Sequence, residues 1–421
     1  MPRLQNEPVL FDENTVLPDW EPTDDEITCA LELNTMNSFR SQFRRLRTRF
    51  NSFRAMLEAE MNDLAAFTDW AEGYRDRFIE QKSQLLIGSE MEKVPEDVEI
   101  ITYFDQAYPQ QLREIYDPPP VLYIRGDFSF DHSTSISIVG SRSFSDYGRS
   151  TAEMFAYQLA SWGFTVISGG ARGIDSIAHR AALDAGGKTI AVMGSGLDVI
   201  FPAENDKLFR RIGEKGALIT EFPMGTIPEK YNFPARNRII AALSRGTLVI
   251  EAPEKSGALI TADLALQNGR EIFAIPGRLT DGRSRGTNKL ILDGAHIALD
   301  PSDIPVRFGL TVLEGDEVQE EDITAQLRGD EAVVYGATGL EAKEADALVR
   351  EVGLPAARVL SALLILQTRG IVRELPGSRF VRPVFPSKRL PPSREDDENQ
   401  IPETESAVCN VVKESCNESD N

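Results

Sequence analysis

Short apolar segments alternate with amphipathic segments along the middle of the chain, from residue 135 to residue 300. The apolar segments are uninterrupted, as in strands that are buried on both faces of a sheet. The segments between them repeat apolar residues with the period of a helix. This alternation predicts an α/β fold with a parallel, doubly wound, Rossmann-like sheet. The predicted strands are 136–140, 165–170, 189–196, 217–223, 247–253 and 271–277.

Helical periodicity dominates the region before this core. Phe39, Phe43, Leu46, Phe50 and Phe53 recur at alternating intervals of four and three residues, which predicts one apolar stripe along a helix. Six arginines lie between positions 40 and 54 with no acidic residue among them. They form either the solvated basic face of a small helical domain or an auxiliary nucleic-acid surface.

The chain changes character twice outside the core. Three successive prolines at 118–120 exclude a helix or a central strand, so we expect an extended connector before a short strand at 121–125. Near the C-terminus, two helical segments, 340–353 and 354–370, precede two strands around a turn at 371–383. A helix–turn–helix followed by a hairpin is the winged-helix plan.

These patterns divide the chain into six predicted segments. They are an acidic N-terminus expected to be disordered (1–26), a helical domain (27–95), the Rossmann-like core (96–300), an acidic linker (301–325), a winged-helix-like domain (326–384) and an acidic tail expected to be disordered (385–421).

The composition refines this picture. Of the 421 residues, 41% are hydrophobic and 26% are charged, which is typical of a chain with a packed core. The net charge of −21 by itself argues against nucleic acid. Between residues 135 and 300, however, 19 Lys and Arg compare with 17 Asp and Glu. Because binding depends on the local patch, the acidic ends do not exclude a nucleic-acid partner.

We expect a cytoplasmic protein without a membrane anchor. No apolar run approaches the roughly 20 residues of a membrane span, and we expect no secretory leader. Three scattered cysteines and three histidines give neither a disulfide framework nor a metal site.

Glycine-rich loops follow the first two predicted strands of the core, at 140–142 and 169–173. Each loop precedes a helix, so its backbone N–H groups are expected to point toward a phosphate. Neither loop carries a nucleophile, a metal cluster or the Lys-Ser/Thr pair of nucleotide triphosphatases. The loops therefore indicate either phosphate binding without hydrolysis or simply tight turns.

Residues near other strand ends extend this candidate site. Lys207 either reaches the same crevice or is a solvated helix lysine. Arg236 and Arg238 lie in the first turn of a predicted helix, where cations oppose the helix dipole, so we expect an anionic ligand for one and a salt bridge for the other. The starts of two further helices either donate to a ligand or act as caps. The candidate nucleic-acid-binding residues are Gly140, Ser141, Arg142, Gly169, Gly170, Arg172, Gly173, Lys207, Arg236, Asn237, Arg238, Ser256, Gly257, Thr287 and Asn288.

No catalytic group or cofactor site emerges. His179 lies one turn after Asp175, the expected N-cap, but no nucleophile stands beside it, so we predict a hydrogen-bonding or structural histidine. Phe144, Phe201 and Phe233 either stack on bases or pack in the core.

At this point several motifs, in their order, resemble the DNA-processing protein A family (DprA, also called Smf). The motifs are VGSR, SGGARGIDSIAH, GSGLDVIFPAEN, TEFP, FPARNRIIAALS, SGALITADLA and IPG followed by RGTNKLILDGA. The resemblance covers roughly residues 100–300, and residues 339–383 resemble the winged-helix-like domain of the same family. The sequence does not distinguish whether that domain binds DNA, binds protein or packs on the core.

The resemblance implies a non-catalytic protein that binds single-stranded DNA. It implies that the protein protects incoming DNA and loads RecA recombinase during natural transformation and homologous recombination, as a homodimer. The phosphate contacts that it implies are Ser141, Arg142, Gly169, Gly170, Arg172, Gly173 and Lys207, with Arg236, Asn237 and Arg238 nearby.

Two enzymatic alternatives share the Rossmann-like core. A nucleotide phosphoribohydrolase of the lysine-decarboxylase-like group would typically carry a PGGxGT loop, whereas the corresponding stretch here is EAPEKSGALIT. A dinucleotide-dependent oxidoreductase is disfavoured because VGSRSF is not GxGxxG.

Overall fold

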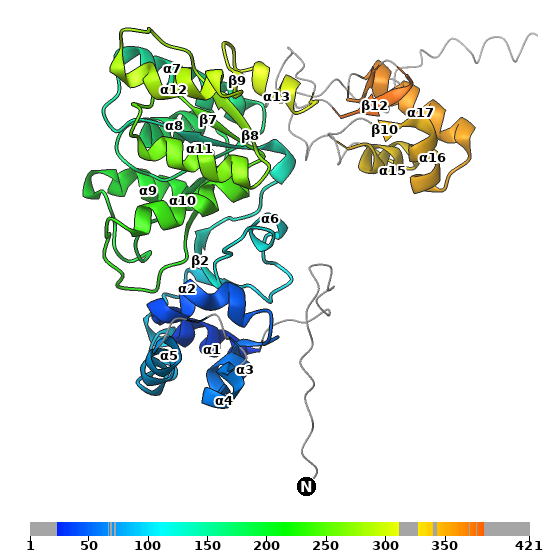
Figure 1. The fold of residues 1–421 in the computed structure, drawn as a ribbon. Coiled ribbons are helices and arrows are strands. Elements are labelled where there is room, and N and C mark those ends of the chain that lie inside the picture. The colour runs from blue at the N-terminus through cyan, green and yellow to red at the C-terminus, as the bar shows by residue number, and fades with distance from the viewer. Residues whose placement is uncertain are drawn as a thin grey trace, which may run out of the picture. The chain divides into compact units, whose positions relative to one another are not determined.

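The computed structural model describes residues 23–65, 67, 70, 73–310, 327–339, 343–369, 371–375 and 377–382 (Figure 1). The chain forms two compact units, the first ending at Phe308 and the second beginning at Gly309. Residues 1–22 of the segment expected to be disordered at 1–26, residues 311–325 of the linker expected at 301–325, and the whole tail at 385–421 lie outside the described residues. No helix in the described ranges has the length and apolar character that a membrane crossing requires.

The first unit begins with a group of helices. They are α1 (Asp24–Thr35), α2 (Asn37–Leu46), α3 (Phe53–Glu58), α4 (Met61–Leu64) and α5 (Tyr74–Ser83). The prediction that the apolar stripe lies on a single helix is wrong, because a turn divides the stripe between α2 and α3. Its residues still form one core, in which the ring of Phe43 stacks on that of Phe53 at 5.7 Å.

Two segment ends differ from the prediction. Helix α1 begins at Asp24, inside the segment expected to be disordered, because the Glu26 carboxylate accepts a hydrogen bond from the backbone N–H of Phe53 at 2.8 Å. The start of the expected linker carries helix α13 (Asp303–Arg307), which is held by the buried side chains of Ile304 and Phe308.

A nine-stranded sheet forms the centre of this unit. Its strands are β1 (Val98–Thr102), β2 (Val121–Gly126), β3 (Ser135–Val139), β4 (Thr165–Ser168), β5 (Thr189–Val192), β6 (Ala217–Thr220), β7 (Gly246–Val249), β8 (Glu271–Ala274) and β9 (His296–Ile297). The order is β1-β2-β6-β5-β4-β3-β7-β8-β9. Strands β3 to β9 run parallel, whereas β1 and β2 extend the sheet antiparallel beside β6. The predicted Rossmann-like sheet is confirmed, with this antiparallel addition.

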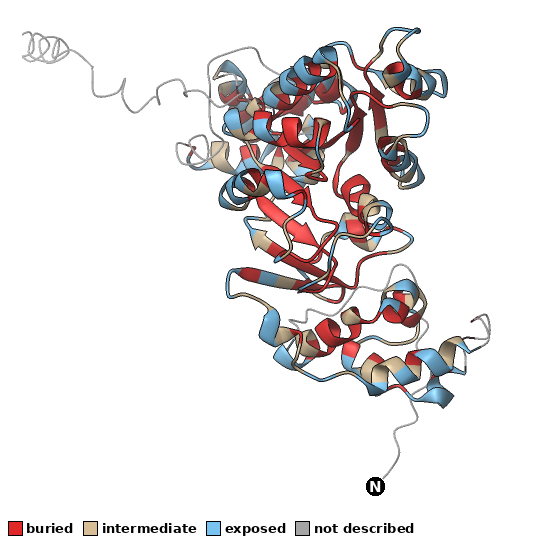
Figure 2. Ribbon diagram, turned by 90° about the vertical axis from the view of Figure 1, so that its left-hand side faces the viewer, coloured by how far each residue is buried: buried red, intermediate tan, exposed pale blue. Residues whose placement is uncertain are grey.

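Helices cover both faces of the sheet. They are α6 (Gln110–Arg113), α7 (Asp146–Ser161), α8 (Ile174–Asp184), α9 (Asp206–Lys215), α10 (Asn232–Leu243), α11 (Gly257–Gln267) and α12 (Arg285–Leu292). Right-handed crossovers place α7, α8 and α9 on one face and α10, α11 and α12 on the other. The parallel strands β3 to β7 between them are buried (Figure 2). Because β3 lies between β4 and β7, the direction of winding reverses at β3 and β7, where such sheets hold their ligands.

The second unit has the winged-helix plan. Its elements are α15 (Asp330–Ala337), β10 (Lys343–Glu344), α16 (Ala345–Val352), α17 (Ala356–Thr368), β11 (Arg373–Leu375) and β12 (Arg379–Val381). The strands pair antiparallel in the order β10-β12-β11. The segment 340–353 is therefore not helical throughout, because Lys343 and Glu344 pair with β12 before α16 begins. Leu348, Val359 and Leu363 are central to its own apolar core.

Candidate nucleic-acid interface

The two predicted glycine-rich loops lie against each other at the carboxyl edge of the sheet. The loop after β3 leads into α7, whose N-cap Ser145 accepts a hydrogen bond from Gly148 N at 3.0 Å. The loop after β4 leads into α8, and Ile174 N at the start of that helix donates to Ser141 O at 3.3 Å. The fold therefore brings the two sequence-predicted loops together.

Glycines permit this contact. Gly173 has a φ of +92°, and a Cβ there would lie 2.4 Å from Ser141 O and 2.7 Å from Arg142 Cα. A Cβ at Gly169 would lie 2.6 Å from the guanidinium of Arg236. Similar Cβ atoms at Gly140 and Gly170 would meet the side chains of Ile174 and Phe209. Larger residues at these positions would separate the loops from each other and from the helices that support them.

Asp175 and Arg236 hold the second loop from beneath. The Asp175 carboxylate accepts hydrogen bonds from Gly169 N at 3.2 Å and Ala171 N at 3.4 Å. Burial raises the pKa of this carboxyl, although Arg236 and the two N–H groups favour its ionised form. The expectation that Asp175 is the N-cap is wrong, because the N-cap is Gly173 and Asp175 lies inside the first turn of α8.

Arg236 is buried rather than directed to solvent. It is 4% exposed and donates from Nη1 to Gly169 O at 2.6 Å and also to Val192 O. Burial lowers the pKa of this guanidinium to about 10. Arg238 forms the salt bridge expected for one of the two arginines, with Glu221 and, from Nε, with Asp117 at 3.5 Å. Neither side chain reaches outward, so both serve the scaffold of the site.

Two other arginines are exposed at the loops. Arg142 lies over the ring of Phe233, 5.6 Å from its centroid, and no acid among the described residues pairs with it. Phe233 in turn contacts Phe201 at 5.8 Å between ring centroids, and Phe201 is 43% exposed. Arg172 is ion-paired with Glu204, with 2.9 Å between Nη2 and Oε2. The edge thus presents cations beside aromatic rings.

The remaining candidates differ in how free they are. Lys207 is exposed near the start of α9, Asn237 is half-buried, and a Cβ at the exposed Gly257 would meet open space. Ser256 caps α11 by accepting from Ala258 N at 3.3 Å.

Two candidates at the start of α12 are occupied by internal bonds. The hydroxyl of the buried Thr287 donates to Ser284 O at 3.1 Å, and Asn288 exchanges two hydrogen bonds with the backbone of Gly277. The two residues hold this helix start in place rather than offering free donors.

A carboxylate fills the point where the winding of the sheet reverses. Glu251 lies two residues after the end of β7, is 1% exposed, and accepts hydrogen bonds from the N–H and the hydroxyl of Ser145. Its backbone carbonyl accepts from Ser141 N at 2.7 Å. Glu251 therefore fixes the loop after β3 and occupies the N-terminus of α7. The sequence analysis missed this role because the two partners lie 106 residues apart.

His179 is a structural histidine. It is fully buried, and its Nδ1 lies 2.6 Å from the Thr189 hydroxyl, which itself donates to Val166 O. Nδ1 therefore carries the proton, and burial lowers the pKa of the ring to about 3. A neutral, buried ring without a neighbouring nucleophile has no part in acid–base chemistry at the loops. No group of three or more metal-ligating side chains occurs in the described ranges.

Comparison with known proteins places this chain in a family. The family model for DNA recombination-mediator protein A matches residues 99–309, and that for the DprA winged helix domain matches residues 318–378. Protein Smf of Escherichia coli K12 is 39% identical over 284 residues, which are 66% of this chain and 75% of Smf. DNA processing protein DprA of Streptococcus pneumoniae R6 is 41% identical over 53% of this chain and 77% of its own length.

A solved structure agrees with the sequence matches. The X-ray structure of DNA processing protein A from Streptococcus pneumoniae aligns with a TM-score of 0.57 and 34% identity, covering 69% of this chain and 99% of that chain. The expected resemblance is confirmed, and the chain belongs to the family of DNA recombination-mediator protein A, also named DprA or Smf.

Proposed function

We propose that the carboxyl edge of the sheet binds single-stranded DNA without cleaving it. One observation carries this proposal: the exposed Arg142 lies over Phe233, which contacts the exposed Phe201, directly beside the glycine-rich loops. Phosphates of a strand would lie along the loop N–H groups and the arginines. Unpaired bases would stack on the aromatic rings. The bases of a duplex are already stacked on one another and are not available for this contact.

The candidate residues divide into two roles in this proposal. Arg142, Arg172, Lys207, Asn237, Ser256 and Gly257, together with the N–H groups of Gly140, Gly170 and Gly173, contact the strand. The N–H groups of Ser141 and Gly169 already bind Glu251 and Asp175, so these two residues support the loops. Arg236, Arg238, Thr287 and Asn288 hold those contacts in place, because their polar atoms already bind other parts of the protein.

We further propose a role in the cytoplasm during natural transformation and homologous recombination. The protein would protect incoming DNA and load RecA recombinase onto it. The names of the matched family, a recombination mediator, and of the relatives, DNA processing proteins, support this role.

Homodimer formation belongs to the same proposal. Leu292, Ile297 and Leu299, within eight residues around the edge strand β9, are 85%, 50% and 71% exposed. An apolar group of this kind at the edge of a sheet is suited to an interface between two copies.

Fluorescence anisotropy with labelled single-stranded and duplex oligonucleotides over a salt series tests the binding proposal. We expect tighter binding of the single strand, tolerance of its sequence, and a steep loss of affinity with salt. Arg142→Ala and Arg172→Ala should each lower the salt slope by about 0.7 per lost phosphate contact. Arg358→Ala, which removes an arginine paired with Asp330 in the winged-helix unit, is the matched control. Release of free base from nucleotides, or unchanged binding in both loop variants, would contradict the proposal.

A further inference from the structure

Helix α17 of the winged-helix unit occupies the position from which this kind of domain commonly reads DNA. It is the second helix of the helix–turn–helix pair, and such recognition helices enter the major groove with polar and basic side chains. Two exposed residues of α17 are apolar, although Ser361, Gln367 and Thr368 of the same helix are also exposed. Leu360 is 49% exposed and Leu364 is 64% exposed.

The basic residues at this helix are already engaged. Arg358, the one cation within α17, donates from Nε to Asp330 at 2.6 Å. Arg369, just after the helix, pairs with Glu331 at 3.1 Å. A DNA backbone would therefore meet leucines, uncharged polar side chains and engaged arginines on this helix.

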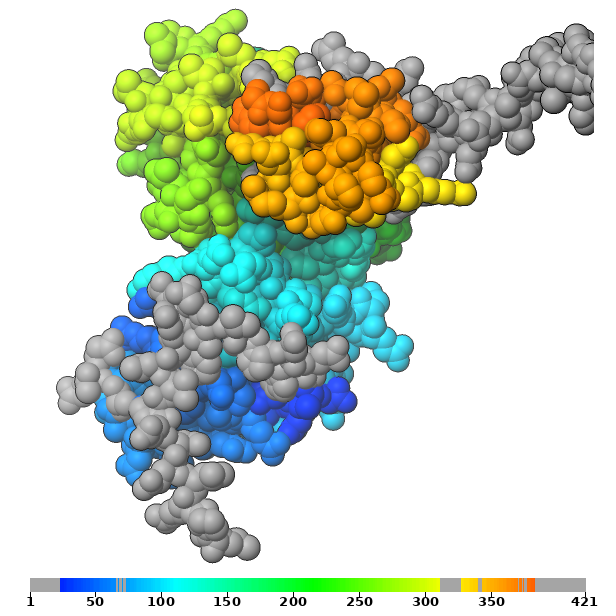
Figure 3. Space-filling model, turned by 90° about the vertical axis from the view of Figure 1, so that its right-hand side faces the viewer, coloured from blue at the N-terminus to red at the C-terminus, as the bar shows by residue number. Residues whose placement is uncertain are grey.

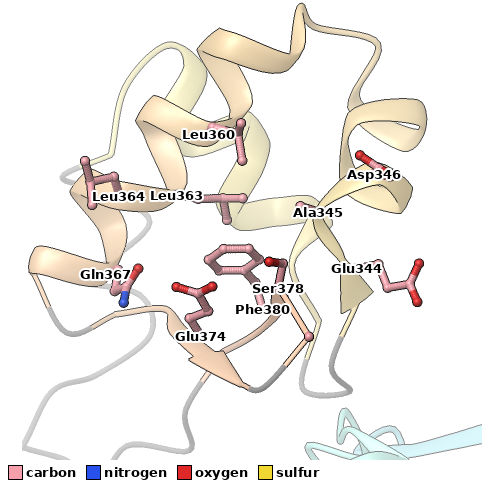
Figure 4. Close-up of a pocket in the computed structure, with 11 residues that line it drawn as sticks. Glu344, Ala345, Asp346, Leu360, Leu363, Leu364, Gln367, Glu374, Ser378 and Phe380 are labelled. Atoms are coloured by element: carbon pink, nitrogen blue, oxygen red, sulfur yellow. The ribbon is translucent and has the colours of Figure 1, made fainter.

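The two leucines line a groove of about 570 Å³ between α17 and the strands (Figure 4). Leu363 and Phe380 form its floor, and both are buried. The unit that carries the groove is drawn in yellow to orange in Figure 3. Exposed leucines one turn apart beside a concave apolar floor form the kind of site that accepts the apolar face of a helix.

The rim of the groove is acidic. Glu374 of β11 lies on one side, and Glu344 and Asp346 lie on the other (Figure 4). All three are exposed, and no cation among the described residues forms a salt bridge with them. Among the residues that the structure describes, no Lys, Arg or His lines the groove. Its electrostatic potential therefore repels phosphates and attracts ammonium and guanidinium groups.

We propose that this groove binds a short amphipathic helix of another protein, with apolar side chains on one face and Lys or Arg at its flanks. The leucines and Phe380 would take the apolar face, and the three carboxylates would pair with the flanking cations. This inference is independent of the DNA-binding proposal, because it concerns the other unit of the chain.

Two synthetic peptides provide the test. Both are helical, about 14 residues long, and share one pattern of leucines, but one is flanked by lysines and the other by glutamates. Their binding to the full-length protein is measured by fluorescence anisotropy. We expect the lysine-flanked peptide to bind about tenfold more tightly than the glutamate-flanked peptide.

Variants connect that binding to the groove. Leu364→Glu should weaken binding of the lysine-flanked peptide about tenfold. Val333→Glu is the matched control, because Val333 of α15 is 51% exposed and does not line the groove. The double variant Glu344→Lys with Glu374→Lys should reverse the preference between the two peptides. Circular dichroism melting checks that each variant is folded.

Several results would overturn this proposal. They are equal affinity for the two peptides, no binding of either at about 1 mM, or equal losses in the Leu364 and Val333 variants. Loss of duplex DNA binding in Leu364→Glu would instead assign α17 to DNA. Binding of the lysine-flanked peptide that appears only after the chain is truncated beyond Arg382 would assign the groove to the chain's own C-terminal segment.

Discussion

The carboxyl edge of the sheet and helix α17 expose different chemistry, although both lie where such folds bind ligands in other proteins, phosphate-bearing ligands at the sheet edge and DNA at the second helix of a helix–turn–helix. The edge presents Arg142 and Arg172 beside aromatic rings. Helix α17 presents Leu360 and Leu364 beside unpaired carboxylates. The architecture of each unit provides a site, and the side chains decide which partner that site fits.

The two regions also differ in how their charges are held. At the sheet edge, a buried carboxylate and a buried arginine, Asp175 and Arg236, position the loops and leave Arg142 free. In the winged-helix unit Arg358 and Arg369 are themselves paired, and the three carboxylates at the rim of the groove form no salt bridge with a cation of the described residues. Under the two proposals, a nearly neutral core binds an anion while another unit of the same chain repels one.

The strongest way to break this contrast is to separate the two loops. In Gly173→Ala, the new methyl group would clash with Ser141 O, and the positive φ would be strained. We expect loss of single-strand binding and a loss of about 2–4 kcal/mol in the free energy of unfolding. Gly186→Ala is the control, because its φ is +78° but a Cβ there meets open space, so only the strain of about 1 kcal/mol applies. Denaturant unfolding and anisotropy measure both effects, and similar behaviour of the two variants would remove the proposed contact between the loops.

Acid should affect the two units differently. The pKa of His179 is lowered to about 3 in the folded state, so the unfolded state binds an extra proton below about pH 6.5. The contribution of neutral His179 to the free energy of unfolding is fully present above pH 6.5. It falls by about 1.4 kcal/mol per pH unit as the pH decreases toward 3. All three histidines of the chain precede residue 308, so no histidine contributes to the pH dependence of the winged-helix unit's stability. Hydrogen exchange followed through each unit at pH 7 and pH 5 measures the difference.

His179→Gln provides the control for this prediction. The variant should lose stability at neutral pH, because the packing around the ring changes, yet its stability should depend less steeply on pH. A pH profile parallel to that of the parent protein would show that other groups cause the acid sensitivity.

Changing the charge of α17 sharpens the contrast. In the double variant Leu360→Arg with Leu364→Arg, we expect duplex DNA binding to appear at low salt, with a slope of about 0.9 per new phosphate contact. Binding of single strands at the sheet edge should not change. Strong duplex binding by the unchanged protein, with no gain in the double variant, would mean that α17 already contacts DNA.

The smallest expected effect concerns the one ion pair at the loops. Glu204 pairs with Arg172 at a site where both side chains are exposed. Glu204→Gln should leave the arginine free for phosphate and strengthen single-strand binding by about two- to threefold, since exposed pairs are weak. Asp184→Gln, which removes the acid paired with Arg211 on α9, is a matched control away from the loops. Weaker binding in Glu204→Gln would show instead that the acid positions Arg172.

Strands β2 to β8, the glycine-rich loops and the winged-helix plan could be predicted from the amino-acid sequence, whereas β1, β9 and β10 could not. These features depend on the spacing of apolar residues and on glycines that permit particular turns. Both can be recognised from residues that are close together in the sequence. The motifs around Arg142 and Arg172 also identified the family, as the comparisons confirm.

Only the tertiary structure decided which polar groups remain available. Glu251 meets Ser145 across 106 residues, and Arg236 meets Gly169 across 67 residues. The same is true of α17, whose periodicity alone fits core packing, DNA binding or protein binding. The reason is physical: burial and pairing consume charges and donors, and the partners come together only when the sheet and the hairpin assemble.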